Sequence, residues 1–539
     1  MNKKVASVLL LGVMLIAVFF HLFYINKVPP CLNADEVAFS YNAFSIWKTG
    51  KDEYGKFLPL RFRSFDDFKL PVYTYLTVPI VAVLGLNDTS TRLLNVIIGI
   101  SFIPLTFLLA KELFNDKRIA LLSALFISIS PWIYILSRHA HEGVPGALFA
   151  LLAFYFLVRY AKTGRLKYFA FTCVSSLLTA SSYHSGRLFL LFFIAAVALV
   201  ALKNFRSHST KNLILKAVLV IVCVLLPFGI DAYYGANRVT SLFFLNNQGF
   251  QLRINEYLTE HNFRIIHNKV VEGVRDVSHR YFAQISPEFF VIHGDTNLRF
   301  GYENMGLITP LEYIGIFIGL YFIFKRKEPF RYLIVFILLL SPLPNAFTWQ
   351  DMSIIRSYFL IFPIVLLVGY GAFHLFDSLP HKKYILPVSI VILGGVYLFF
   401  AGLNWDIYFL HYPKRAAVVR AWQCGYKELV SYVQDNYSQY DQFVITRKHG
   451  QPYVYFLYFM NYDPAHYQNQ AKLTGPDGYG FGQVEKFDKF IFNFSFDPMK
   501  KRTVFIGYPE EFKDTGIDET KVKHIRIRTE DIFWIYESK

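Results

Sequence analysis

The sequence has few charged residues and few cysteines. Charged residues make up 17% of its 539 residues, while hydrophobic residues make up 54%; a typical soluble domain has roughly 25% charged residues. This composition excludes a disordered or collagenous chain. The four cysteines are too sparse for a disulfide-stapled scaffold and lack the spacing of a metal site; they are Cys31, Cys173, Cys223 and Cys424. Cysteine chemistry is therefore not the expected function.

Long apolar runs recur through the first 400 residues and predict a polytopic α-helical membrane protein. About 20 apolar residues cross a bilayer as a helix. We expect about 11 transmembrane helices, at residues 5–26, 93–110, 119–137, 143–158, 168–186, 188–202, 212–230, 305–324, 332–350, 357–376 and 384–405. The first run is long, and Pro29-Pro30-Cys31 lacks a small-residue cleavage pattern, so we expect a retained span rather than a signal peptide.

The positive charge indicates the orientation of these spans. The chain has 55 Lys and Arg against 39 Asp and Glu. This excess lies in short loops between apolar runs, so it is read as a topology signal and not as a nucleic-acid surface. The apolar stretch 71–87 is short and holds Pro71 and Pro79. If it does not cross, every basic loop faces the cytoplasm; these loops are 111–118, 159–167, 203–216, 325–331 and 381–383. We therefore expect it to be an interfacial or re-entrant helix.

This topology predicts two domains in the cell membrane. Residues 1–405 form the membrane domain, with a cytoplasmic N-terminus, a first outer loop at 27–92 and a long outer loop at 231–304. Residues 406–539 form an extracytoplasmic soluble α/β domain, with a helix at 421–434 and strands at 442–446, 489–496, 503–507 and 524–527. Cys31 and Cys424 both lie outside, where they are able to pair.

Ionisable residues gather in the outer segments, where carboxylates near the bilayer are costly and often functional. Asp35 and Glu36 follow the first span and either cap a helix or serve as catalytic carboxylates. Asp66, Asp67 and Lys69 precede the interfacial helix, where a lysine also suits a headgroup contact.

Three further outer segments carry candidate residues. Arg138, His139, His141 and Glu142 crowd one five-residue turn, and metal binding by this histidine pair has little support without a third ligand. Asp295 and Arg299 lie in a turn of the long loop, and Arg356 lies at the mouth of a later span. Arginine suits phosphate through its planar fork of donors, although a lipid-headgroup anchor remains an alternative.

Together these residues resemble the GT-C superfamily of integral-membrane glycosyltransferases. The resemblance is to glycosyltransferase family 39, which is related to protein O-mannosyltransferases and to the aminoarabinose transferase of lipid A. It covers residues 1 to about 405 and depends on Asp35-Glu36, the segment Asp67-Phe68-Lys69-Leu70-Pro71, Arg92, and Ser137-Arg138 followed by an acidic residue. That residue is usually an aspartate soon followed by proline, whereas here Glu142 precedes Gly143-Val144-Pro145.

The resemblance implies transfer of a sugar, with inversion, from a polyprenyl-phosphate donor to an acceptor hydroxyl. Asp35 is the candidate base, with Glu36 and Glu142 as further catalytic candidates. The candidates for the donor phosphate are Lys69, Arg138, Arg356 and Arg299, and those for other substrate contacts are Asp67, His139, His141 and Asp295. The absence of a glycine-rich nucleotide motif agrees with a lipid-linked donor. The acceptor is a lipid, a glycan or a protein, and a divalent metal ion remains possible.

Two other classes fit some of these features. A transporter or a flippase for lipid-linked glycans also has many spans, but it should place ionisable groups near the bilayer midplane, where only Lys216 stands out. A membrane receptor would not need dense polar outer loops. The placement of charge favours a glycosyltransferase.

The orientation can be tested by cysteine labelling. After replacement of the native cysteines, a cysteine at Asn115 or Thr163 should be shielded from a membrane-impermeant thiol reagent in intact cells. One at Asn246 or Ser438 should be labelled. Labelling at the first two positions would mean that residues 71–87 cross the membrane.

Overall fold

A computed structural model describes residues 2–64, 67–203, 210–234, 243–380, 384–476, 482–513 and 515–538. The chain divides into two compact units. The helical unit comprises Met1–Phe23, Asn95–Arg138 and Glu142–Leu410. The mixed unit comprises Tyr24–Leu94, His139–His141 and His411–Lys539, so the segment after α1 and the C-terminal region belong to one body.

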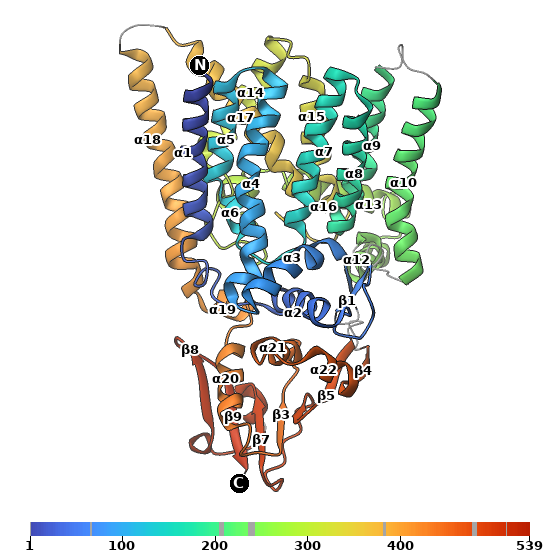
Figure 1. Ribbon diagram of the computed structural model, residues 1–539, viewed down its shortest axis with the longest axis vertical. Helices are drawn as coiled ribbons and strands as arrows, with labels where there is room; N and C mark the ends of the chain where they lie inside the picture. The colour runs from blue at the N-terminus through green and yellow to red at the C-terminus, as the bar shows by residue number, and fades with distance from the viewer. Residues whose placement is uncertain are drawn as a thin grey trace. The chain divides into compact units, whose positions relative to one another are not determined.

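The helical unit consists of long apolar helices arranged side by side (Figure 1). These are α1 (Lys3–Leu22), α4 (Asp88–Phe114, which begins in the mixed unit), α5 (Lys117–Ile129), α6 (Pro131–Ser137), α7 (Gly143–Thr163), α8 (Leu166–Ser182), α9 (His184–Lys203), α10 (Thr210–Tyr234), α14 (Pro310–Lys325), α15 (Arg331–Leu340), α16 (Leu343–Ala346), α17 (Ile361–Asp377) and α18 (Ile385–Asp406). Two amphipathic helices lie between α10 and α14, namely α12 (Gln248–Glu260) and α13 (Lys269–Ala283).

Helices are present at all the expected apolar segments. Among the described residues, five helices are long and apolar enough to cross a membrane, or six if the bent pair α5 and α6 is one span. This pair bends by 54°, because Pro131 follows Ser130 and removes a backbone donor. Several other apolar helices are shorter, so the number of eleven spans stays a prediction.

Glycines allow close helix packing in this unit. α14 packs against α17, where a Cβ atom added at Gly371 would lie 2.7 Å from the backbone nitrogen of Gly319. Small residues at such crossings let two backbones approach closely, which is a common source of helix association in membranes.

The segment that follows α1 folds within the mixed unit. α2 (Ala34–Thr49) begins at a capping box formed by Asn33 and Glu36, and it ends at Gly50 in the left-handed conformation. β1 (Phe62–Ser64) pairs with β2 (Asp67–Lys69), and α3 (Pro71–Leu84) follows. α3 is a 14-residue helix that packs against α2, as expected for a segment too short to cross a bilayer alone.

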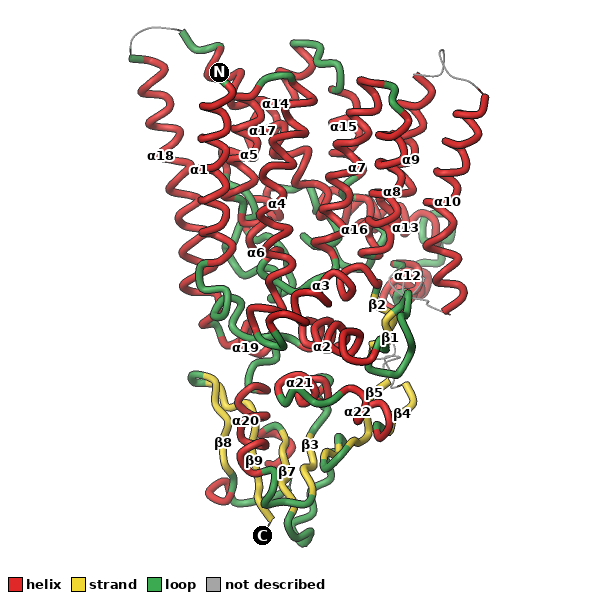
Figure 2. Tube along the Cα trace, in the orientation of Figure 1, coloured by secondary structure: helices red, strands yellow, loops and turns green. Residues whose placement is uncertain are grey.

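The C-terminal region is built around a seven-stranded sheet of order β4-β5-β6-β3-β7-β9-β8 (Figure 2). β3 is parallel to β6 and β7, and the other neighbours are antiparallel. Its elements are α19 (Ala416–Ala421), α20 (Tyr426–Asn436), β3 (Gln442–Ile445), α21 (Pro452–Phe459), α22 (Pro464–Gln470), β4 (Lys472–Pro476), β5 (Gly482–Phe487), β6 (Phe490–Ile491), β7 (Thr503–Gly507), α23 (Pro509–Lys513), β8 (Lys523–Ile527) and β9 (Glu530–Ser538).

The expected helix at 421–434 is divided in two. α19 ends at Ala421 and α20 begins at Tyr426, because Gly425 between them has a φ of 105°. All four expected strands occur, although the one at 489–496 is only two residues long. The sequence pattern missed β4, β5 and β9.

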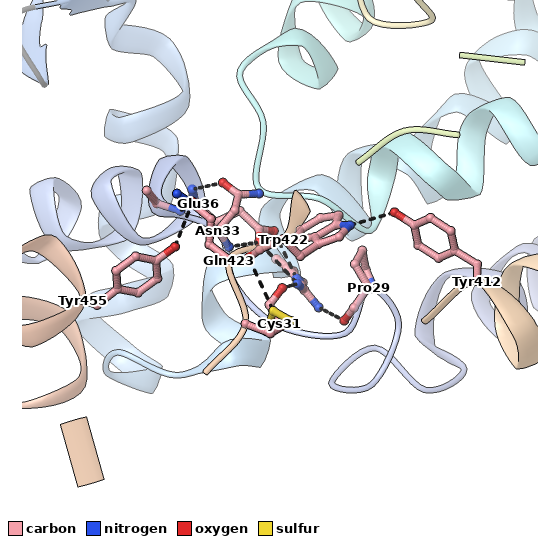
Figure 3. The surroundings of a disulfide bond; sticks show 11 residues. Pro29, Cys31, Asn33, Glu36, Tyr412, Trp422, Gln423 and Tyr455 are labelled. Carbon is pink, nitrogen blue, oxygen red and sulfur yellow. Dashed lines mark hydrogen bonds and ion pairs between the residues drawn. A yellow bond between two sulfur atoms is a disulfide. The ribbon is translucent and has the colours of Figure 1, made fainter. Parts of the chain in front are cut away.

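A disulfide joins Cys31 to Cys424 within the mixed unit, with a Cα–Cα distance of 5.6 Å (Figure 3). The two cysteines are 393 residues apart in the sequence. The bond therefore ties the segment after α1 to the turn between α19 and α20. Cys173 and Cys223 are free and buried in the helical unit.

Replacing both Cys31 and Cys424 by serine should lower the stability of the mixed unit. Loss of a native disulfide typically costs about 2–5 kcal/mol. We expect a lower melting temperature for the purified double variant, and a reductant should shift the parent protein in the same direction. A Cys173→Ser variant, which keeps the disulfide, is the matched control. Equal melting temperatures of the double variant and the parent would contradict this role of the bond.

Candidate active site

An ion pair between Asp35 and Lys69 is the most open pair of charges in the predicted site. Asp35 lies in the first turn of α2, and Lys69 ends β2. The Lys69 Nζ donates to Oδ1 of Asp35 at 2.8 Å and lies 4.3 Å from the ring centroid of Phe39. The Asp35 side chain is 46% exposed, whereas that of Lys69 is 10% exposed. The pair therefore presents an accessible carboxylate backed by a shielded cation.

The neighbouring carboxylate, Glu36, is fully buried and bonded on both oxygens. Oε1 accepts from Arg92 Nε at 3.1 Å and from the Ala140 backbone N–H at 2.9 Å. Oε2 accepts from Arg92 Nη2 at 3.3 Å and from the Asn33 backbone N–H at 3.1 Å. These contacts favour a structural role for Glu36, because its carboxylate is already engaged by four donors.

Arg92 completes this buried centre. Its guanidinium donates to the carbonyl oxygens of Ile25, Pro29 and Cys31 at 3.0, 3.1 and 2.6 Å (Figure 3). The residue is 1% exposed. Arg92 thus fixes the backbone that leads into α2, and through Glu36 it fixes the first turn of that helix.

Gln423 links the C-terminal region to the same turn. Its Oε1 accepts from the Ala34 backbone N–H and from the Tyr455 hydroxyl, both at 3.1 Å (Figure 3). One of the unpaired donors at the start of α2 is thereby satisfied. Asp35 is the next residue, so the C-terminal region helps to hold it in place.

His139, His141 and Asp67 are the other predicted site residues of the mixed unit. His139 is 2% exposed, and its ring packs edge-on against Trp422 with a centroid distance of 4.3 Å. His141 is half-buried. Asp67 lies opposite Ser64 at the start of β2, while Asp66 lies outside the described residues.

Arg138 and Glu142 lie in the helical unit. Arg138 is fully buried and donates through Nη1 to the carbonyl oxygens of Phe20 and His21 at 3.2 and 2.8 Å. A guanidinium at these carbonyls stabilises the C-terminal end of α1. Glu142 is 8% exposed and directly precedes α7.

Asp295 organises two loops of the helical unit. Its Oδ1 accepts from the Asn297 backbone N–H at 2.8 Å and from Gln350 Nε2 at 3.3 Å. Its Oδ2 accepts from the Ile354 backbone N–H at 2.8 Å. Burial raises the pKa of Asp295 to about 6, while these N–H groups and the charge of Arg356 act in the opposite direction.

Arg299 and Arg356 both follow this aspartate in the sequence. Arg356 is half-buried, donates through Nη1 to the Thr348 hydroxyl at 2.7 Å and lies 5.5 Å from the centre of the Trp349 ring system. Arg299 is also half-buried, and its backbone N–H donates to the Asn297 side chain at 3.0 Å. Both guanidinium groups therefore remain partly accessible to solvent.

Two buried charged features were missed from the sequence. Glu53 is 1% exposed in the mixed unit, and Arg187 pairs with Asp231 between α9 and α10 in the helical unit. None of these three residues is among the predicted site residues. A carboxylate and a cation at the facing ends of adjacent spans would have been a usable signal for the Arg187–Asp231 pair.

The mixed unit also has a cavity of about 400 Å³ beside the disulfide. It is of the size that small ligands occupy. Charged, amide and aromatic side chains share its lining, including Lys27, Asp88, Gln423, Tyr426, Lys427 and Tyr455. Within the described residues there is no group of three or more His, Cys, Asp and Glu side chains that could hold a metal ion.

Comparisons with known proteins concern the family and the fold. The family model for dolichyl-phosphate-mannose-protein mannosyltransferases matches residues 69–230. The structure is similar to ArnT from Cupriavidus metallidurans bound to undecaprenyl phosphate, with a TM-score of 0.57, 11% identity and coverage of 99% of this chain and 98% of that chain. The apo form of the same protein gives a TM-score of 0.55, 12% identity and coverage of 98% and 97%.

A third structure is the archaeal oligosaccharyltransferase AglB from Archaeoglobus fulgidus, in complex with an inhibitory peptide and a dolichol-phosphate. Its TM-score is 0.51, with 12% identity and coverage of 85% of this chain. The chain has a GT-C fold. It spans 64% of the length of AglB. A search of curated protein sequences gives no significant match. The resemblance to GT-C glycosyltransferases inferred from the sequence is thus confirmed.

The Arg92–Glu36 pair should dominate the stability of this GT-C fold near α2. Breaking a buried ion pair on one side typically costs about 3–5 kcal/mol, since it leaves an uncompensated buried charge. We expect Glu36→Gln and Arg92→Met each to lower the melting temperature strongly. The double variant Glu36→Gln/Arg92→Met should lose less than the sum of the two, which a double-mutant cycle on purified protein would measure. Strict additivity would contradict direct coupling.

Proposed function

We propose that this protein is an integral-membrane glycosyltransferase. It moves a sugar from a polyprenyl-phosphate-linked donor to an acceptor hydroxyl at the outer face of the membrane, with inversion at the sugar carbon. The observation that carries this proposal is the Asp35–Lys69 pair, in which an accessible carboxylate touches a shielded cation at 2.8 Å. The GT-C fold and the match to the mannosyltransferase family model support it.

The pair suits the chemistry of sugar transfer from a phosphate. Asp35 takes the proton of the acceptor hydroxyl while the oxygen of that hydroxyl bonds to the anomeric carbon of the donor sugar. The bond between that carbon and the phosphate oxygen breaks, and its electron pair leaves with the lipid phosphate. Lys69 stabilises the negative charge of this leaving group, since a fixed cation in a shielded place favours developing charge.

Structural neighbours support a lipid-linked donor. The ArnT structure holds undecaprenyl phosphate, and the AglB structure holds a dolichol-phosphate. We extend this class of donor to the present chain. Arg356 and Arg299 are further candidates for the phosphate because their guanidinium groups are partly accessible. Arg138 is hydrogen-bonded to the C-terminal end of α1, so we assign it a positioning role rather than a contact with the donor phosphate.

The proposed location is the cell membrane, with a cytoplasmic N-terminus and the C-terminal domain outside. The basic loops support this orientation. The Cys31–Cys424 disulfide is an independent argument, because disulfides persist in oxidising compartments and are rare in the cytosol. The partners are then membrane lipids, the lipid-linked donor and an acceptor. The cavity beside the disulfide is the candidate acceptor site, since Lys27, Tyr426 and Lys427 offer both charge and aromatic surface.

Asp35→Asn should slow sugar transfer at least about a hundredfold. The amide keeps the size of the side chain but cannot accept the hydroxyl proton, and general-base catalysis typically contributes about 10²–10⁴-fold. Donor binding should change much less. Transfer by purified protein from a polyprenyl-phosphate sugar, together with binding of undecaprenyl phosphate, measures both effects.

Lys69→Met is the complementary variant, and it should weaken donor binding as well as transfer. Asp435→Asn, an exposed carboxylate on α20 outside the cavity beside the disulfide, is the matched control and should leave both unchanged. Near-parent transfer by folded Asp35→Asn protein would refute the role of Asp35. Movement of lipid-linked glycan across vesicles without formation of a glycosidic product would favour a flippase instead.

A further inference from the structure

The helix α13 of the helical unit turns charged residues inward and valines outward. Glu272, Asp276 and Arg280 are spaced i, i+4 and i+8, so they form one stripe along the helix. Glu272 is 1% exposed and Arg280 is 6% exposed, whereas Val270 and Val274 are 73% and 63% exposed. This arrangement is the reverse of that of a helix facing water, which buries its apolar side chains and exposes its charged ones.

The contacts of the inward stripe fix the rotation of α13. Arg253 of α12 pairs with Asp276 at a distance of 2.5 Å. Arg280 donates through Nε to the carbonyl oxygen of Ala346 at 3.0 Å, and α13 packs against α16, which ends at Ala346 (Figure 1). Turning the valines toward the protein would break these contacts and leave buried charges without partners, which is costly.

The neighbouring helix α12 has the ordinary orientation. Its residues Phe250 and Ile254 are buried in an apolar cluster with Phe244, whereas Asn255 and Glu256 are exposed. Two helices of the same loop therefore present different chemistry, because α12 shows a polar face and α13 an apolar one. The exposed valines are thus a feature of α13 itself and not of this whole region.

The turn between α12 and α13 extends the apolar face, and Asn268 orders this turn. Its Nδ2 donates to the carbonyl oxygens of Arg264 and Ile265 at 3.1 and 2.9 Å. Its Oδ1 accepts from the backbone N–H groups of Val270 and Val271 at 3.0 and 3.1 Å, which caps α13. The exposed apolar residues of the turn and the helix are called the apolar tip below; they are Phe263, Ile265, Ile266, Val270, Val271 and Val274.

The exposed charges around the apolar tip are mostly positive. Arg264 and Lys269 lie between its apolar residues and are exposed, and the side chain of Arg275 is 64% exposed. The nearest carboxylates in the sequence are Glu272, which is buried, and Glu260, which ends α12 and is exposed. Exposed cations among apolar side chains are typical of segments that lie in the surface of a bilayer, where the cations meet the lipid phosphates.

We propose that the apolar tip inserts into the boundary between the headgroups and the acyl chains of a lipid bilayer and anchors α13 there. A bilayer is the occupant that the surroundings favour, because the same unit contains helices long and apolar enough to cross a membrane. The tip is therefore tethered close to lipid. This inference depends on a membrane location and not on the proposed reaction.

The anchor acts on the turn that follows α16. Arg280 of α13 donates to the carbonyl oxygen of Ala346. Two residues further on, the Thr348 hydroxyl accepts from Arg356, a candidate ligand of the donor phosphate. Insertion of the apolar tip thereby fixes the depth of this turn, and of the Arg356 contact, relative to the bilayer.

The experiment measures contact with lipid by fluorescence quenching. Both free cysteines are replaced by serine, the disulfide is kept, and one new cysteine carries a nitrobenzoxadiazole label. The variants are Ile265→Cys and Val274→Cys at the tip, with Glu256→Cys on the polar face of α12 as the matched control. Full-length protein is reconstituted in vesicles of phosphatidylethanolamine and phosphatidylglycerol that carry a nitroxide either near the headgroup or near the end of the acyl chain.

The headgroup nitroxide should quench both tip labels by about half or more and the Glu256→Cys label by less than about a tenth, since an interfacial helix lies about 5–10 Å into the boundary. The nitroxide near the chain end should quench the tip labels less than the headgroup nitroxide does. Equal quenching at Val274→Cys and Glu256→Cys, or stronger quenching by the deep nitroxide, overturns the proposal.

Water-soluble iodide distinguishes the other states of the tip. Protection of the tip labels from iodide, together with lipid quenching, supports insertion. Iodide quenching of Val274→Cys as strong as that of Glu256→Cys means that the tip faces water, and the proposal is then wrong. Protection from both iodide and the lipid nitroxides means that protein covers the tip, which also overturns the proposal. Dependence of this protection on the protein-to-lipid ratio identifies a second copy as the cover, and independence identifies another part of the same chain.

Discussion

The buried contact between Arg92 and Glu36 is the constraint on which the candidate site depends. One guanidinium is shared between the Glu36 carboxylate and the carbonyl oxygens of Ile25, Pro29 and Cys31. The same carboxylate caps α2 and accepts the N–H of Ala140. Because an uncompensated charge at this depth is so costly, these backbone segments are able to occupy only a narrow range of arrangements. This network fixes the first turn of α2 and thereby sets the position of Asp35.

The three carboxyl groups of Asp35, Glu36 and Glu53 differ in burial, and we assign the first two different roles on that basis. Asp35 is half-exposed and has Lys69 on one oxygen, which suits the proposed role of this carboxylate as a base. Glu36 is enclosed and fully bonded, which suits it to hold the backbone. Glu53 is enclosed, and burial raises the pKa of its carboxyl group to about 8. In the proposed site, proton transfer and the positioning of the backbone are thus assigned to different carboxylates.

Much of the fold and the general location of the candidate site could be predicted from the sequence, because apolar runs and basic loops are local patterns. The helices at the expected spans, the short α3 and the ionisable outer segments all follow from them. From the sequence, Asp35 and Lys69 could be expected only to lie in the same region. They are 34 positions apart, and their direct contact depends on the β1–β2 hairpin. The burial of Arg138 and the engagement of Glu36 could not be predicted, because Arg138 depends on backbone carbonyl groups and Glu36 on backbone N–H groups that only the folded chain brings to them. Glu53 gave no signal, since a carboxylate in a polar segment is ordinarily exposed.

The long separation of Cys31 from Cys424 has a consequence for biogenesis. Ribosomes deliver Cys31 early and Cys424 almost 400 residues later, so the first thiol must remain reduced, or be held by a carrier, while most of the chain is still being inserted. The covalent closure of the mixed unit is then one of the last events of maturation. Completion of the mixed unit thereby becomes dependent on thiol oxidation, and a shortage of oxidant would accumulate chains in which this bond is still open.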